Sequence, residues 1–352
     1  MLDHFAFDHI ADAQAGAGLI RLSGNLYVLR FEAMKVASAL GAVGQLMSDG
    51  RITPGDTLVD SSSGIYAYSL ALACHKYGFR CHIVASPSVD LTLKTQLELL
   101  GATVEQPATS HDACFDQAAR VDRVIEYVKD HPRAHWMGQY HDQVHYAGYR
   151  PVARDVAACL AAPRGMTLVC AVGTGASSGG LATALAALGV RAWLVGMQPF
   201  GSVSFGSGHI EDPRFLISGT GSGMFFANID YSLYREIHWI GFDYARAGCI
   251  GLMREHGIFA GLSSGAAYLA ARWAAGAHGR GPDGPVVFVA PDTGHRYVTE
   301  VFASADPVVS PDPAHPIAIA RQAQLRLPWC WTDWAANSAA FTVPEPDQAG
   351  GR

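Results

Sequence analysis

Lys35 is the side chain best suited to nucleophilic chemistry here, because its setting is unusual for a lysine. The 352 residues include only four lysines, and Lys76, Lys94 and Lys129 lie in sequence typical of polar helix surfaces or helix ends. Lys35 instead follows the apolar run LYVLRFEAM and precedes the small-residue stretch VASALGAVGQL. That pattern predicts a buried strand followed at once by a packed helix. Poor solvation lowers the pKa of an ammonium, so this amine could attack a carbonyl.

Polar loops follow several apolar runs, at the places where parallel strands would end. The loop SSSGIYA (61–67) offers three hydroxyls and the exposed amides of a helix start, which suit an anion such as a carboxylate. A plain helix N-cap would also explain its serines, and that alternative stays open. The loop GTGASSGG (173–180) offers backbone amides and the hydroxyls of Thr174, Ser177 and Ser178, which suit a phosphate monoester.

Other interpretations of these loops have less support. GTGASSGG has Ser178 where a dinucleotide fingerprint has its third glycine, and no lysine follows as in a Walker loop. The loop GLSSG (261–265) matches the nucleophile elbow of serine hydrolases, with Asp292 and His295 downstream. Only the short piece GIFA precedes that elbow, and its two partners share one loop, PDTGHRY (291–297), which could direct Asp292 or Thr293 into the same cleft.

No metal site is expected. His141 and His145 are four residues apart and could share a helix face, but no HExxH pattern or nearby cysteine accompanies them. We therefore interpret both as ordinary surface or core histidines.

The elements that must position these residues alternate between apolar strands and Ala/Leu-rich helices. Examples are TLVDSSS before IYAYSLALACHKYG, and TLVCAVGTG before SSGGLATALAALG. This alternation predicts an α/β fold with two three-layer α/β/α domains and mostly parallel sheets. We expect a smaller mobile domain over 37–143, a larger cofactor-binding domain over 12–36 and 144–305, and a C-terminal extension over 306–352. In the extension, the tryptophans of PWCWTDW could pack onto the body or form a lid or dimer contact, and PEPDQAGGR is predicted to be disordered.

Composition excludes several classes of function. A net charge of −6 with 16% charged residues argues against nucleic-acid binding. The seven cysteines form no CxxC pair, which is typical of buried thiols in a reducing compartment. The N-terminus has no signal-peptide pattern, and no apolar run reaches the roughly 18 residues that span a bilayer. We expect a cytoplasmic protein with neither a membrane nor a nucleic-acid partner.

A lysine amine, a phosphate loop and a carboxylate loop together suggest pyridoxal 5'-phosphate, which carries an aldehyde, a phosphate and a pyridine nitrogen. The order strand-Lys, SSSG, QY, GTGASSGG, GLSSGAA and DTGHRY resembles the cysteine synthase family, fold type II of the pyridoxal-phosphate enzymes, over about residues 15–305. Within that family, GQYHDQVHYAGYR, GSVSFG and DTGHRYVTEVFAS resemble the branch that makes N-(2-amino-2-carboxyethyl)-L-glutamate from O-phosphoserine and glutamate.

The resemblance implies a role for each matching position. Lys35 would form the internal aldimine and then act as base for the substrate Cα proton. Ser263 would meet the pyridine nitrogen as a neutral partner. The cofactor phosphate would be held by Gly173, Thr174, Gly175, Ala176 and Ser177, and the substrate carboxylate by Ser61, Ser62, Ser63, Gly64 and Gln139.

Two positions depart from the family pattern. Ile65 stands where the family has the Asn that bonds the cofactor's phenolic oxygen, which removes a hydrogen bond worth ~1.5–3 kcal/mol unless Tyr66 or Tyr68 replaces it. The N-P-x-G-S-x-K-D-R signature around Lys35 is also shortened. The substrate or the reaction could therefore differ from cysteine synthesis.

The implied activity is that of a transferase. The resemblance implies β-replacement on an O-activated serine (O-phosphoserine or O-acetylserine) through an aminoacrylate, by a homodimer. A small nucleophile would then give cysteine or a β-substituted alanine such as a 2,3-diaminopropionate precursor. β-Elimination or an ammonia-lyase reaction on a hydroxy amino acid is the first alternative, and a catalytically degenerate binding protein is the second.

Overall fold

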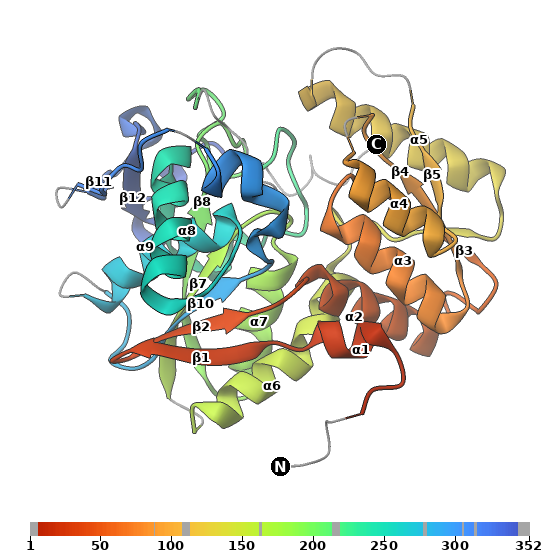
Figure 1. Ribbon diagram of the computed structural model, residues 1–352, viewed down its shortest axis with the longest axis horizontal. Coiled ribbons are helices and arrows are strands. Elements are labelled where there is room, and N and C mark those ends of the chain that lie inside the picture. The colour runs from red at the N-terminus through yellow and green to blue at the C-terminus, as the bar shows by residue number, and fades with distance from the viewer. Residues whose placement is uncertain are drawn as a thin grey trace. The chain divides into compact units, whose positions relative to one another are not determined.

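The chain folds into two compact units, each with its own sheet and core (Figure 1). The computed structural model describes residues 6–87, 89–107, 113–161, 164–212, 219–276, 280–304, 306–312 and 315–343. The first unit comprises Met1–Gly16 and Ala33–Tyr149, and the second comprises Ala17–Glu32 and Arg150–Arg352. Lys35 thus belongs to the first unit, and the residues after 305 belong to the second. The α/β class and the mostly parallel sheets agree with the prediction from the sequence.

The first unit holds a parallel sheet with strand order β5-β4-β3-β6. Leu58 and Ile83 pack in a core with α2, α3 and α4, whereas Val59 and Val84 pack with Val124 of α5. Helices therefore cover both faces, since successive strand side chains point to opposite sides. The elements are α1 (Ile10–Ala15), α2 (Lys35–Ser48), β3 (Thr57–Ser61), α3 (Ile65–Tyr77), β4 (Arg80–Val84), α4 (Leu91–Leu99), β5 (Thr103–Glu105), α5 (Ala113–Asp130), β6 (Ala134–Trp136) and the 3-10 helix η1 (Gln143–Gly148).

The second unit holds a larger sheet with strand order β1-β2-β10-β7-β8-β9-β12-β11. Strands β2, β10, β7, β8 and β9 run parallel, while β1 and β12 are antiparallel to their neighbours β2 and β9. Its core lies between this sheet and the helices α8 and α9. The elements through β10 are β1 (Gly18–Ser23), β2 (Leu26–Arg30), α6 (Tyr149–Cys159), β7 (Gly165–Ala171), α7 (Ala176–Ala187), β8 (Arg191–Gln198), η2 (Tyr231–Leu233), β9 (Tyr234–Ile240), α8 (Phe242–His256), α9 (Leu262–Ala275) and β10 (Val286–Ala290).

The C-terminal segment completes the second sheet. β12 pairs with β9, and Trp329 and Trp334 are buried, so the tryptophans pack onto the body, the first of the two alternatives from the sequence. The predicted disorder of PEPDQAGGR (344–352) lies outside the described residues. The elements here are η3 (Gly294–Tyr297), the π-helix η4 (Val298–Phe302), β11 (Ile317–Ala318), η5 (Gln322–Gln324), β12 (Trp329–Asp333), α10 (Trp334–Asn337) and η6 (Ser338–Ala340).

Two expectations about residue environment can be compared with the structure. Of the six cysteines whose side-chain burial the structure describes, Cys159 is exposed, so the prediction of buried thiols is wrong there and holds for the other five. Cys159 is the last residue of α6, on the polar side of that helix end. Within the described ranges, no helix combines the length and the apolar character that a membrane span requires.

Candidate active site

The predicted substrate loop lies at the topological switch point of the first sheet. The chain runs from β3 to β4 and β5 on one side and then returns to β6 on the other side of β3, so the strand order reverses between β3 and β6. The loop Ser62–Gly64 follows β3, and Gln139 follows β6. Open α/β sheets bind ligands in the crevice at such a point. The two segments do meet, because Gln139 Nε2 donates to the Ser61 carbonyl at 2.7 Å.

The amides of this loop, rather than its serine oxygens, are placed to receive an anion. Helix α3 begins at Ile65 with Gly64 as its N-cap and without a side-chain capping bond, so the alternative of a serine N-cap is wrong. Ser63 Oγ instead accepts from Ser86 N at 2.6 Å, which braces the loop against the segment after β4. Uncapped first-turn amides with the positive end of the helix dipole suit a carboxylate.

Lys35 lies where its sequence predicts, as the first residue of α2. The side chain is half-buried, and its ammonium makes no hydrogen bond or ion pair with the described residues. Burial lowers the pKa of Lys35 to about 8, although the charge of Asp60 opposes that shift. The start of a helix also disfavours a cation. Roughly a tenth of this amine is therefore unprotonated at pH 7, far more than for an ordinary lysine.

Neutral groups surround α2 on the side of η1. Burial lowers the pKa of His145 to about 4, so the imidazole is uncharged at neutral pH. Its Nε2 lies 3.0 Å from the Met137 carbonyl and 3.5 Å from the Tyr66 hydroxyl. The Tyr68 hydroxyl donates to Gln14 Oε1 at 3.3 Å. Both tyrosine hydroxyls thus have partners within the first unit.

Arg120 lies beside the predicted substrate loop, and the sequence analysis did not identify it. It lies on α5 with only 7% of its surface exposed, and its Nη1 donates to Ser61 Oγ at 3.1 Å. The Tyr140 hydroxyl donates to the Ser61 carbonyl at 3.3 Å, so two further side chains converge on the end of β3. The available signal was that Arg120 shares a helix face with Val124, one turn away, which packs on the sheet. The result is a buried cation beside the substrate loop.

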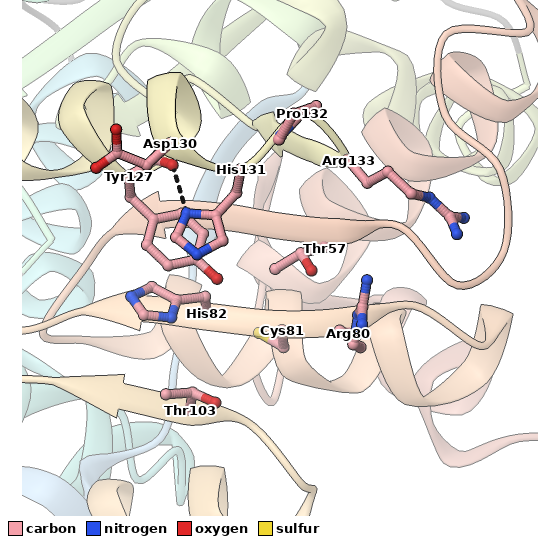
Figure 2. A pocket seen from close by; sticks show the side chains of 10 residues that line it. All are labelled: Thr57, Arg80, Cys81, His82, Thr103, Tyr127, Asp130, His131, Pro132 and Arg133. Atoms are coloured by element: carbon pink, nitrogen blue, oxygen red, sulfur yellow. Dashed lines mark hydrogen bonds between the residues drawn. The ribbon is translucent and has the colours of Figure 1, made fainter.

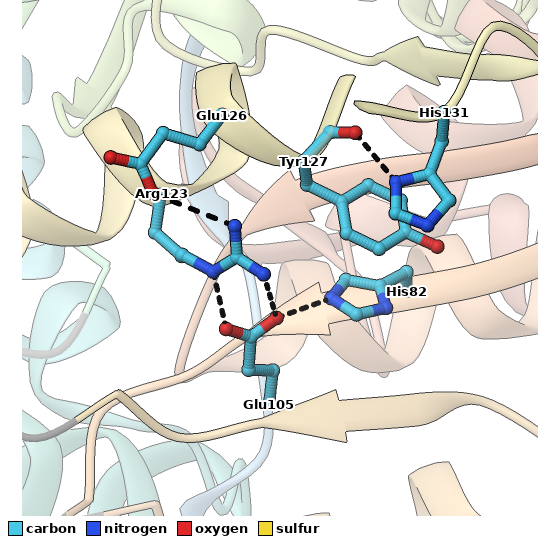
Figure 3. Close-up of polar contacts among 6 residues, drawn as sticks. All are labelled: His82, Glu105, Arg123, Glu126, Tyr127 and His131. Atoms are coloured by element: carbon cyan, nitrogen blue, oxygen red, sulfur yellow. Dashed lines mark hydrogen bonds and ion pairs between the residues drawn. The ribbon is translucent and has the colours of Figure 1, made fainter. Parts of the chain in front are cut away.

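The far half of α5 is fixed to β4 and β5 by a polar and aromatic network (Figure 3). Arg123 Nε donates to Glu105 Oε1 at 2.5 Å, and Glu105 Oε2 lies 3.0 Å from His82 Nε2. The ring of Tyr127 stacks between His82 and His131, with ring centroids 4.0 and 3.9 Å apart. These contacts set the position of the helix that carries Arg120.

A pocket of about 310 Å³ lies beside this network, at the amino ends of β3, β4 and β5 (Figure 2). The substrate loop is at the carboxyl ends of the same strands, so the pocket is at the opposite edge of the sheet. It is separate from the predicted substrate site. Its walls are Thr57, Arg80, Cys81, His82, Thr103, Tyr127, Asp130, His131, Pro132 and Arg133.

The predicted phosphate loop lies at the switch point of the second sheet, after β7, which has β8 on one side and β10 on the other. Two of its glycines are sterically required. A Cβ on Gly173 would lie 2.4 Å from the Gly219 carbonyl oxygen, and Gly175 has φ +81° with the Asn228 carbonyl 2.9 Å from its ideal Cβ. Helix α7 then begins at Ala176 without a side-chain cap. Ala176 N donates to Thr174 Oγ1 at 3.4 Å, and the start of a helix is a setting that suits a phosphate.

Ser178 and Ser263 differ in whether their hydroxyls already have hydrogen-bond partners. Ser178 Oγ lies 2.7 Å from the Tyr234 hydroxyl and points into the core, so its expected contribution to the phosphate loop is wrong. Ser263, in the first turn of α9, is 3% exposed, and its hydroxyl has no hydrogen-bond partner among the described residues. Gly248 of α8 allows the close approach that fixes this turn, since a Cβ there would lie 2.1 Å from the Gly265 carbonyl oxygen.

The hydrolase interpretation finds no support in the geometry. His295 Nδ1 lies 3.0 Å from Thr293 Oγ1, and Asp292 Oδ2 accepts from the Tyr297 hydroxyl at 2.8 Å. A catalytic triad needs a hydrogen bond between its aspartate and its histidine. Asp292 and His295 instead bond to other residues.

Comparison with known proteins places this arrangement in a family. Residues 27–292 match the model of the family described as "Pyridoxal-phosphate dependent enzyme", which is well over half of the chain. The chain belongs to this family. Its cofactor is accordingly pyridoxal 5'-phosphate, and the enzyme is of the cysteine synthase type.

Individual relatives agree with this assignment. The N-(2-amino-2-carboxyethyl)-L-glutamate synthase of Ralstonia nicotianae is 30% identical over 266 residues, covering 73% of this chain and 74% of the relative. A cysteine synthase of Staphylococcus aureus is 26% identical, covering 76% and 84%. Two solved structures share the fold. O-acetylserine sulfhydrylase isoform 3 from Entamoeba histolytica has a TM-score of 0.75 at 21% identity, covering 87% of this chain and 94% of its own. O-ureido-L-serine synthase has a TM-score of 0.71 at 23% identity, covering 86% and 96%.

Proposed function

We propose that this enzyme catalyses β-replacement on O-phosphoserine. The Cβ–O bond of the substrate breaks, phosphate leaves, and a small nucleophile forms a new bond to Cβ, giving a β-substituted alanine. The names of the relatives support replacement on serine derivatives. We choose O-phosphoserine because the buried Arg120 guanidinium donates to the Ser61 side chain.

The residues present fit the cofactor. The Gly173–Ser177 segment offers a cradle that side chains would fill, and the partnerless hydroxyl of Ser263 suits a pyridine nitrogen. Lys35 offers an amine that is partly unprotonated and has no competing partner among the described residues. When bound, pyridoxal 5'-phosphate withdraws electrons from the substrate Cα. The neutral Ser263 partner favours departure of a good leaving group over demanding carbanion chemistry.

The substrate would be oriented by the first unit. The uncapped amides after Gly64, together with Gln139, would bind the α-carboxylate. Lys35 would remove the Cα proton and later return it, since an amine with a pKa near 8 can do both at neutral pH. Ile65 offers no hydrogen bond, and it packs against the apolar core of the unit.

Arg120 supplies the charge that an anionic leaving group requires. A guanidinium pairs with phosphate bidentately and remains protonated at all relevant pH values. Acetate also leaves as an anion, but the acetyl ester is neutral in the bound substrate, whereas a phosphate monoester already carries about −1.5 to −2 charge. O-Phosphoserine should therefore be preferred over O-acetylserine.

Substrate titration of the purified holoenzyme tests this proposal. We expect O-phosphoserine to change the cofactor absorbance and to release phosphate when glutamate or sulfide is added as nucleophile. Arg120→Gln should lower kcat/KM for O-phosphoserine ~10–100-fold, corresponding to about 1.5–3 kcal/mol for a charge-assisted hydrogen bond. The same change should affect O-acetylserine much less.

The exposed Arg133→Gln in the same unit is the matched control and should leave both substrates unchanged. An Arg120→Gln enzyme with equal losses on both substrates would contradict the role of the guanidinium. A wild-type enzyme that is inert to every activated serine would contradict the proposed reaction itself.

A further inference from the structure

Asp60 is a buried carboxylate that joins the two segments of the substrate site. It lies near the carboxyl end of β3 with 1% of its surface exposed. Its Oδ1 accepts from Ser61 N at 2.8 Å and from Trp136 Nε1 at 3.2 Å. Its Oδ2 accepts from Gln139 N at 3.0 Å. One side chain thus holds the start of the substrate loop and the residue after β6 in a single hydrogen-bonded frame.

These contacts suit the ionised form of the carboxyl group, which accepts hydrogen bonds at both oxygens. An ionised carboxylate in an apolar setting is costly. A carboxamide of similar shape could not make the same contacts, because both oxygens of Asp60 accept from N–H groups and an amide NH2 only donates. Burial raises the pKa of Asp60 to about 6, yet the carboxyl remains ionised at neutral pH because three N–H donors stabilise the anion.

The amine of Lys35 responds to that charge. Asp60 is the group that holds the pKa of Lys35 up against the effect of burial. Other titratable groups nearby are neutral at pH 7 to 8: burial lowers the pKa of His145 and raises that of Tyr66 and Tyr140. Asp142 caps η1 by accepting from Val144 N, and Arg120 adds a positive charge beside Ser61.

We propose that Asp60 is a positioning residue with two tasks in this site. Its carboxylate fixes the substrate loop relative to Gln139, and its negative charge keeps the Lys35 amine basic enough to accept the substrate proton. The second task rests on the role proposed for Lys35, whereas the first rests on the contacts alone.

Competitive amine labelling of the full-length protein, prepared without cofactor, tests the charge. The protein is acetylated across pH 6 to 10, and the Lys35 peptide is quantified by mass spectrometry. We expect the midpoint of labelling near pH 8 in the wild type. Asp60→Asn should lower that midpoint by roughly one unit, the effect of removing a neighbouring opposite charge. Lys94 and Lys129 in the same samples serve as internal references and should keep their midpoints.

Asp56→Asn is the matched control, since Asp56 lies at the other end of β3 and pairs with Arg133. It should leave the Lys35 midpoint unchanged. An Asp60→Asn protein whose Lys35 midpoint equals that of the wild type would overturn the electrostatic task. Because this experiment uses no substrate, its failure is distinguishable from failure of the proposed reaction.

Asp60→Glu separates the two tasks and covers the case in which Asp60→Asn does not fold. Glutamate keeps the charge but moves the carboxylate by one methylene. We expect an unchanged Lys35 midpoint, together with a KM for O-phosphoserine at least about 10-fold higher and a smaller change in kcat. A KM equal to that of the wild type would overturn the positioning of the loop.

Discussion

At the scale of single residues, the pKa of the buried Asp292 carboxyl depends strongly on its surroundings. Burial raises the pKa of its carboxyl to about 6 from an ordinary value of 3.8, although the Tyr297 hydroxyl donates to it. The folded state therefore binds a proton that the unfolded state has lost between these two pH values. The stability that this group contributes is complete below pH 4 and falls as the pH rises through 6, by about 3 kcal/mol in total.

Asp292→Asn should remove this pH dependence. We expect the free energy of unfolding of the variant, relative to the wild type, to increase by up to about 3 kcal/mol between pH 4 and pH 8. Urea denaturation at several pH values measures it. The exposed Asp155→Asn in α6 is the control and should give a constant difference. A constant difference for Asp292→Asn as well would show that the carboxyl is not perturbed in the fold.

Single residues were predictable from the sequence where the pattern around them was local. Lys35 stands out because a strand-like run and a helix-like run meet at it, and the structure starts α2 there. Asp60 and Arg120 were not recognised because their partners are distant in sequence. Trp136 and Gln139 lie 76 and 79 residues from Asp60, and Arg120 lies 59 residues from Ser61. No local pattern reports such contacts.

At the scale of elements, the position of α2 depends on a close crossing with η1. An ideal Cβ on Gly148 would lie 1.9 Å from the Ala37 carbonyl oxygen, and one on Gly41 would lie 2.2 Å from Gly148 N and Cα. The backbones of the two elements therefore touch two residues after Lys35. Only glycine permits this approach.

Gly148→Ala should force α2 away from η1. We expect a loss of at least about 3 kcal/mol of stability, the upper range for overpacking, and weaker attachment of the cofactor to Lys35. Urea denaturation and the cofactor absorbance measure the two effects. Gly44→Ala, on the same helix, is the control, since nothing lies within 4 Å of its ideal Cβ. It should gain roughly 0.5–1 kcal/mol from helix propensity. A Gly148→Ala protein as stable as the wild type would show that the crossing can relax.

Several apolar strands could be predicted from the sequence, and the shortest strands could not. β7, β8 and β10 are predominantly apolar runs, which is typical of strands buried on both faces. β5 and β6 have only three residues each, too few for a pattern. β12 was missed because its strand character comes from pairing with β9, about 90 residues earlier, as in the pair Trp329 and Ile240.

At the scale of the molecule, the segment after β10 is held against the second unit by a buried arginine. Arg246 of α8 is buried and donates to the backbone carbonyls of Val301, Ser304, Asp306 and Pro307 at 2.9 to 3.3 Å. One guanidinium thus fixes the path of the chain between β10 and β11. The segment has no regular sheet partner there, so these bonds set its course.

Arg246→Met should release this path. We expect roughly 3 kcal/mol of lost stability, because four carbonyls lose a charged donor, and faster proteolysis between residues 301 and 312. Limited proteolysis with mass spectrometry identifies the cleaved bonds. The exposed Arg254→Met on the same helix is the control and should change neither quantity. Unchanged protection of the segment in Arg246→Met would contradict this role.

The homodimer implied by the family resemblance stays a prediction, which light scattering checks.

The anchoring of α5 has a consequence for how selectivity could evolve. Helix α5 carries Arg120 beside the substrate loop, and it is held by Glu105 one turn further along and by the stacking of Tyr127 on His82 two turns further along. A replacement among these residues should rotate or shift α5 and therefore move the guanidinium of Arg120. Laboratory selection for a new leaving group should therefore recover mutations among these residues, which lie outside the predicted substrate loop.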